Sequence, residues 1–229
     1  MSITMGMVVS VCRKNQLQIK GILLDMTSKQ QELFGMINLI SDCFVRDFVD
    51  SCLRNVPRYF WKIPASCSGN YHPQESLCVG GLVHHTILAV NYAVKLCGEK
   101  GIVLVARDQI LAAVLLHDTC KAGTTDAPDY SCFEEHPLLP REYYREIAMM
   151  AAGADTEEIF TLVESHMGQW SSEGYHPKTI QQKIVHYADY LASRKEQPII
   201  DVKAVLQPLD SWSENDDVFV GDLKEMTVE

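Results

Sequence analysis

A histidine and an aspartate stand at the end of a long apolar run. Residues 110–116 read Ile-Leu-Ala-Ala-Val-Leu-Leu, and His117 and Asp118 follow directly. A helix of this composition is buried, and an unpaired carboxylate at its end costs several kcal/mol unless a cation or a hydrogen-bond network offsets that cost. The pair therefore indicates either a metal site or a capping aspartate beside a satisfied core histidine.

The same kind of polar intrusion recurs elsewhere in the chain. His85 and Asp189 each interrupt an apolar helical stretch, His136 stands at a predicted helix entry, and His166 closes another predicted helix. Imidazole and carboxylate groups are ligands for Mn, Fe, Co, Ni or Zn, and the absence of a cysteine cluster argues against a structural zinc site. We therefore predict a metal centre assembled from several helices.

The elements that must position these side chains are helical. Apolar residues recur at steps of three and four, which is the signature of amphipathic helices. The predicted spans are about 30–55, 81–98, 106–118, 138–152, 155–167 and 178–196. Strand signals are nearly absent, so we predict an all-α domain over residues 30–210. Residues 1–29 are predicted to be an irregular arm or short strands, and residues 211–229 an acidic tail.

Composition restricts the function. The 229 residues are 47% hydrophobic and 22% charged, which is typical of a globular protein, and the formal charge is −10. An acidic surface disfavours long nucleic acids, while a small phosphorylated ligand remains compatible if cations reverse the local field. Eight scattered cysteines without a CxxC pair predict reduced, buried thiols and a cytoplasmic protein. No apolar run is long enough to suggest a membrane span.

Three motifs together resemble the HD-domain superfamily of metal-dependent phosphohydrolases. Leu115-Leu-His-Asp-Thr-Cys-Lys121 is similar to the HD motif, Gly80-Gly-Leu-Val-His-His-Thr86 to the first-histidine motif, and Ala188-Asp-Tyr-Leu-Ala-Ser-Arg194 to the closing aspartate motif. The similarity covers about residues 60–197. It implies a helical bundle with metals in its middle, and it implies that His85 rather than His84 is the ligand.

The resemblance also implies the composition of the site. His85, His117, Asp118 and Asp189 would form the minimal site, and members with a second metal add two histidines, for which His136 and His166 are in the expected places. Asp118 would then bridge two divalent cations, with Mn, Fe, Co, Ni or Mg as candidates. The alternative for the two added histidines is a surface or supporting role.

Several further residues are candidates for catalysis or substrate binding. Paired cations generate hydroxide near neutral pH, and the charge that develops at phosphorus needs a positive group. Lys121, three residues after Asp118, is the first candidate for that group and Arg194 the second. Tyr71 and His72, in the loop before the first metal helix, could stack on a base or contact phosphate. Each of these residues could instead be structural or simply solvated.

Three other histidines are given less functional weight. His186, one helical turn before Asp189, could orient that carboxylate. His84 neighbours a motif residue but points elsewhere, and His176 is predicted to be solvated.

The combined prediction is hydrolysis of a phosphoester or phosphoanhydride bond of a nucleotide-type substrate by metal-activated hydroxide. One alternative is a di-iron oxygenase that uses the same six ligands, and another is a non-catalytic nucleotide-binding regulatory module. The nine methionines and many aromatic residues leave room for a homodimer interface.

Overall fold

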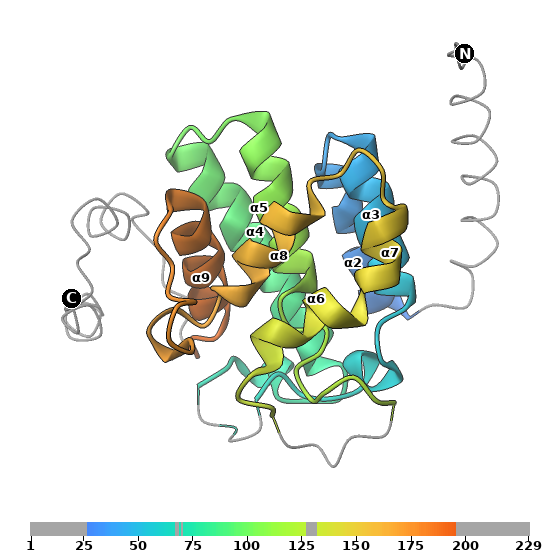
Figure 1. Ribbon diagram of the computed structural model, residues 1–229. Helices are drawn as coiled ribbons and strands as arrows, with labels where there is room; N and C mark the ends of the chain where they lie inside the picture. Colours follow the sequence, from blue (N-terminus) through green and yellow to red (C-terminus); the bar gives the residue numbers. More distant parts are fainter. Residues whose placement is uncertain (1–26, 67–68, 70, 127–131, 196–229) are drawn as a thin grey trace, which may run out of the picture.

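The fold is a helical bundle, as Figure 1 shows. The computed structural model describes residues 27–66, 69, 71–126 and 132–195, and these residues contain helices and no strand. The α-helices are α2 (Ser28–Met36), α3 (Cys43–Arg54), α4 (Gly81–Glu99), α5 (Leu104–Leu116), α6 (Leu139–Tyr143), α7 (Arg145–Met150), α8 (Thr156–Glu164) and α9 (Ile180–Ala192). The all-α prediction is confirmed. Almost all of the predicted N-terminal arm and the whole acidic tail lie outside the described residues.

Helix α5 lies at the centre of the bundle. It packs against α3, α4, α8 and α9, and α4 and α9 also pack against each other. The apolar run from Ile110 to Leu116 is at most 1% exposed at every position, which confirms that the C-terminal half of this helix is buried on all sides. The chain that leaves α5 therefore emerges in the interior of the domain.

The predicted helix over residues 30–55 is broken in the middle. A 3₁₀ turn (Ile37–Leu39) follows α2, and α3 begins after Asp42, which is its N-cap. The Asp42 side chain accepts hydrogen bonds from the backbone N–H groups of Phe44 and Val45. The buried carboxylate of Asp108 on α5 accepts from the backbone N–H groups of Ser41 and Asp42, at 2.9 and 2.8 Å. These two acids satisfy the donors that the break exposes.

Helix ends also differ from the prediction next to the polar residues of interest. Helix α5 stops at Leu116 and α8 at Glu164, whereas the predicted ends were 118 and 167. The predicted helix over 138–152 is divided into a 3₁₀ turn (His136–Leu138), α6 and α7. Several candidate ligands therefore lie in turns just beyond helix ends, where their backbone groups can bond side chains.

Tyr59 holds the turn that follows α5. Its hydroxyl accepts a hydrogen bond from the backbone N–H of Ala122 at 3.1 Å and donates to the carbonyl of Gly123 at 2.5 Å. Tyr59 itself lies in a 3₁₀ turn (Arg58–Trp61) and is 3% exposed. A buried tyrosine that makes both bonds fixes the path of the segment carrying Asp118 and Lys121.

The cysteines only partly follow the prediction. Cys52, Cys97 and Cys120 are buried free thiols, but Cys43 and Cys78 are exposed. Cys132 is disulfide-bonded, which contradicts the expectation that all the thiols are reduced. As for membrane spans, none of the helices in the described part of the chain combines the length and the apolarity to cross a bilayer.

Candidate metal centre

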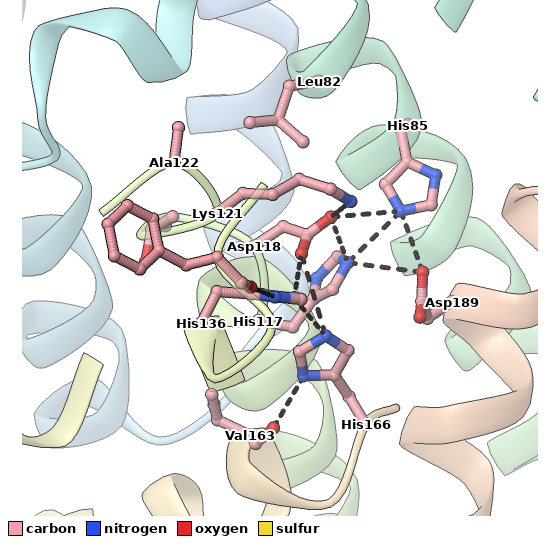
Figure 2. Close-up of polar contacts among 12 residues, drawn as sticks. Leu82, His85, His117, Asp118, Lys121, Ala122, His136, Val163, His166 and Asp189 are labelled. Atoms are coloured by element: carbon pink, nitrogen blue, oxygen red, sulfur yellow. Dashed lines mark hydrogen bonds and ion pairs between the residues drawn. The ribbon is translucent and has the colours of Figure 1, made fainter. Parts of the chain in front are cut away.

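Six histidine and aspartate side chains converge in the middle of the bundle, as Figure 2 shows. The first group takes one residue from α4, two from the turn after α5 and one from α9; its members are His85, His117, Asp118 and Asp189. The second group shares Asp118 and adds His136, from the turn before α6, and His166, from the turn after α8. Within each group the potential ligand atoms all lie within 4.8 Å of one another.

The first group is built around Nε2 of two histidines. His85 Nε2 lies 3.0 Å from Asp189 Oδ1 and 3.3 Å from His117 Nε2. His117 Nε2 is 3.6 Å from the same Asp189 oxygen. Asp118 Oδ2 completes the group, at 3.7 Å from His85 Nε2 and 3.5 Å from His117 Nε2.

The second group is built around the other oxygen of Asp118. Oδ1 lies 3.1 Å from His136 Nε2 and 3.7 Å from His166 Nε2, and the two imidazole nitrogens are 3.2 Å apart. Each carboxylate oxygen of Asp118 thus faces a different group of histidines. This is the geometry expected of a carboxylate that bridges two cations.

Three of the four histidines are held in one tautomer by the backbone. His117, His136 and His166 each place Nδ1 2.7 Å from the carbonyl oxygen of the residue three positions earlier. Nδ1 must donate in these bonds, so in the neutral ring Nε2 carries a lone pair and no proton. Such backbone bonds are the usual way in which a metal-ligating histidine is oriented.

The close approach of the Nε2 atoms then suits a positive species between them. His136 Nε2 and His166 Nε2, both acceptors in this tautomer, cannot hydrogen-bond to each other across 3.2 Å. Two nitrogens bound to one metal at about 2.0–2.1 Å in tetrahedral geometry are separated by about 3.4 Å. In addition, Asp118 Oδ1 is buried without a hydrogen-bond partner. The residues present therefore fit divalent cations.

The charge states suit the same purpose. Burial alone would raise the pKa of Asp118, but Lys121 and His117 hold it well below its usual value. For Asp189 burial also opposes ionisation, and the neighbouring rings of His117 and His85 keep the pKa well below the ordinary range. Burial, reinforced by neighbouring imidazoles, lowers the pKa of His166 to about 3. Ionised carboxylates and a neutral imidazole are the forms that bind metals.

A second layer of contacts supports His166. His186 Nδ1 donates to the His166 carbonyl at 2.8 Å, so this side chain supports a histidine backbone rather than the Asp189 carboxylate predicted for it. Gly168, at φ +61°, makes room for the ring, since a Cβ there would lie 2.1 Å from His186 Cε1. His176, predicted to be solvated, is instead partly buried and lies 3.1 Å from the Gly168 carbonyl through Nδ1.

Lys121 lies at the shared carboxylate. Its Nζ is 2.5 Å from Asp118 Oδ2, and its side chain is 14% exposed. Among the six converging residues Asp189 is the most open, with a side chain that is 19% exposed while that of His85 is fully buried. Asp189 and Lys121 are therefore the side chains through which the cluster borders on solvent.

The remaining candidates neighbour residues of the first group in space or in sequence. The ring of His72 meets the ring of His85 edge-on, with 5.0 Å between centroids. Arg194 Cζ lies 4.1 Å from the ring centroid of Tyr190 and 5.6 Å from that of Tyr71. Sequence reasoning missed Tyr190, although its position next to Asp189 in the closing motif was a usable signal.

The comparisons with known proteins agree with this geometry. A family model described as the HD domain matches residues 82–194, a span that contains all six converging residues. This is an HD-domain protein. Its superfamily consists generally of metal-dependent phosphohydrolases. No curated protein and no solved structure is significantly similar to the chain.

Family membership accounts for the order of the HD-domain motifs along the chain. The matched span begins one residue after the start of α4 and ends at Arg194, just beyond α9. Helices α2 and α3 lie outside it, and they pack on the faces of α4 and α5 that point away from α9. Tyr59, which bonds the turn after the HD dipeptide, also comes from outside the matched span.

Proposed function

We propose that this HD-domain protein is a metal-dependent phosphohydrolase that cleaves a phosphoester or phosphoanhydride bond of a nucleotide-type substrate. The main support for the proposal is that the two carboxylate oxygens of Asp118 face two separate sets of imidazole Nε2 atoms. Such an arrangement fits a pair of cations that share one carboxylate, which is the equipment of enzymes that displace an oxygen at phosphorus.

Each group of ligands would hold one cation. His85, His117, Asp118 and Asp189 would hold the first, and Asp118, His136 and His166 the second. When bound, such cations act as Lewis acids toward phosphoryl oxygens and lower the pKa of coordinated water. The protein contributes a preformed and largely buried cradle, because the side chains of five of the six residues are at most 5% exposed.

Lys121 would supply positive charge to the reacting phosphate. Its ammonium group already lies at Asp118 Oδ2, on the edge of the cluster. In the assembled site, where that oxygen is a ligand, the same ammonium is within reach of a phosphoryl oxygen and would offset the charge that develops there. The turn that Tyr59 holds keeps Lys121 at this distance from Asp118.

His72 would form part of the wall against which the substrate binds. Burial, His85 and Lys121 together lower the pKa of His72 to about 3, so the ring is neutral near pH 7. Its Nδ1 is buried and has no hydrogen-bond partner among the described residues. A neutral imidazole in this position can donate to a phosphate or ribose oxygen without adding charge.

A nucleotide screen tests the proposal directly. The full-length protein, loaded with Mn²⁺, Fe²⁺, Co²⁺ or Ni²⁺, would be incubated with nucleoside mono-, di- and triphosphates, cyclic nucleotides and short oligonucleotides, with release of phosphate or nucleotide as the readout. We expect turnover of at least one class. Absence of turnover with every metal and substrate would overturn the proposal. Iron-dependent O₂ consumption without hydrolysis would instead support a di-iron oxygenase.

A further inference from the structure

One arginine in the domain is oriented by aromatic rings instead of by acids. Cζ of Arg194 lies over the ring of Tyr190 at 4.1 Å and over that of Tyr71 at 5.6 Å, and its Nη2 donates to Ser193 Oγ at 2.9 Å. No carboxylate of the described residues pairs with it, and its Nε is buried without a hydrogen-bond partner. Arg141, in contrast, is held by two glutamates. Arg194 therefore keeps donors and a full positive charge that no acid in the described residues neutralises.

The two tyrosines of the stack are next in sequence to residues of the candidate metal centre. Tyr190 follows Asp189 directly on α9, and Tyr71 precedes His72, whose ring lies against that of His85. Both tyrosines are thus next in sequence to residues at the first group of ligands. Tyr71 is 60% exposed, so the stack is reached from solvent. A molecule bound at the cluster and extending outward past Asp189 would meet this arginine.

We propose that Arg194, clamped between Tyr71 and Tyr190, binds a second anionic group of the substrate, a phosphate beyond the one that reacts. A guanidinium is weakly hydrated and planar, and it binds phosphate through paired N–H groups. Stacking between two rings fixes that plane in advance, which reduces the entropy lost on binding. The substrate class is then a compound with at least two linked phosphates, such as a nucleoside polyphosphate or an oligonucleotide end.

This inference rests on the proposed function only in placing the first phosphate at the cluster, and a binding experiment separates the two. The Mn²⁺-loaded full-length protein would be titrated by calorimetry with phosphate, pyrophosphate and tripolyphosphate. We expect affinity to rise with chain length. In Arg194→Met we expect the gain in affinity from phosphate to pyrophosphate, or from pyrophosphate to tripolyphosphate, to be smaller by about tenfold or more. A hydrogen bond to a charged group contributes about that much to affinity. Arg194→Lys, which retains the charge but not the planar fork, should fall in between.

A matched control removes a different arginine. Arg145 on α7 is 66% exposed at its side chain and pairs loosely with Glu142 at 3.6 Å, away from α9. Arg145→Met should keep the wild-type dependence on chain length. Manganese content and the melting temperature, measured for each variant, show whether the cluster and the fold are intact, and Tyr71→Leu offers a second route to loosen the stack without touching the guanidinium.

The outcomes separate the two proposals. An affinity that does not rise with chain length in the wild type, or a rise that Arg194→Met retains in full, would overturn the second-phosphate site even if the protein hydrolyses nucleotides. A rise that depends on Arg194, in a protein that hydrolyses nothing, would support the site and reject the phosphohydrolase. An Arg194→Met variant that loses its manganese would show a structural role and would also overturn the inference.

Discussion

The two groups of ligands that meet at Asp118 are supported in different ways. In the first, His85 and Asp189 lie within α4 and α9, two helices packed directly on each other and on α5. In the second, His136 and His166 lie in turns next to helix ends, and single hydrogen bonds to backbone carbonyls hold their rings. His85 and Asp189 are thus positioned by the apolar core, and His136 and His166 by a few polar contacts.

This difference has energetic consequences. Helix packing distributes the cost of displacement over many buried side chains, each worth about 1.5–3 kcal/mol, whereas a single hydrogen bond contributes about 1 kcal/mol. We therefore expect the first cation to bind more tightly and the second to be more sensitive to substitutions outside the ligand set. Metal content per chain measures both.

The largest effect is expected where the two groups meet. Asp118→Ala removes an oxygen ligand from each, so it should abolish binding of the second cation and weaken the first. Hydrolytic activity should fall by more than about a hundredfold, because the loss of a residue that only supports a ligand already lowers activity by up to about a hundredfold. Elemental analysis of the purified variant measures the stoichiometry. Retention of two metals per chain would contradict the bridging role.

A pair of adjacent histidines tests the first group. His85→Ala should remove the first cation, because its Nε2 contacts both Asp189 and His117. His84→Ala is the matched control, since its ring bonds Ser76 Oγ at 3.0 Å and lies apart from the cluster. Equal metal loss in the two variants would show that the effect is one of general destabilisation.

The second group should respond to a residue that is not a ligand. His186→Leu removes the hydrogen bond to the His166 carbonyl, and Gly168→Ala would force a Cβ into the space of the same ring. Both should weaken the second cation about 10–100-fold and leave the first nearly unchanged. Competition with a chelator resolves the two affinities. If both sites weakened alike, the distinction between them would be lost.

The smallest effect concerns the metal-free protein at acid pH. Because burial holds the pKa of His166 at about 3, the unfolded chain binds a proton there below about pH 6.5 while the folded chain does not. Folding stability should therefore decline as pH falls from about 6.5 toward 3. In His166→Gln the melting temperature, measured in chelator, should decline less steeply over this range. An equal decline would reject the assignment.

The sequence predicted the helical class, and the structure brings together the residues predicted for the first group, whose sequence signals are local. A long apolar run that ends in His117 and Asp118 is typical of a buried helix with a polar terminus, and its burial is confirmed. The ends of helices were less predictable. The turn that follows α5 is held by hydrogen bonds to Tyr59, about sixty residues away in the chain, which no local pattern reveals.

The supporting contacts were the least predictable part of the site. The position of His186 one turn before Asp189 suggested a bond to that carboxylate, yet the turn after α8 approaches this face of α9 and presents the His166 carbonyl first. Likewise, the Arg194 stack depends on Tyr71, which comes from a loop far away in sequence. Such pairs follow from tertiary packing and have no sequence signature.

The most direct test of the central claim is a crystal structure of the protein soaked with Mn²⁺, with anomalous difference maps to locate the metal. We predict one peak among His85, His117 and Asp189 and a second between His136 and His166, with the carboxylate of Asp118 between them. Peaks elsewhere, or none within this cluster, would contradict the account.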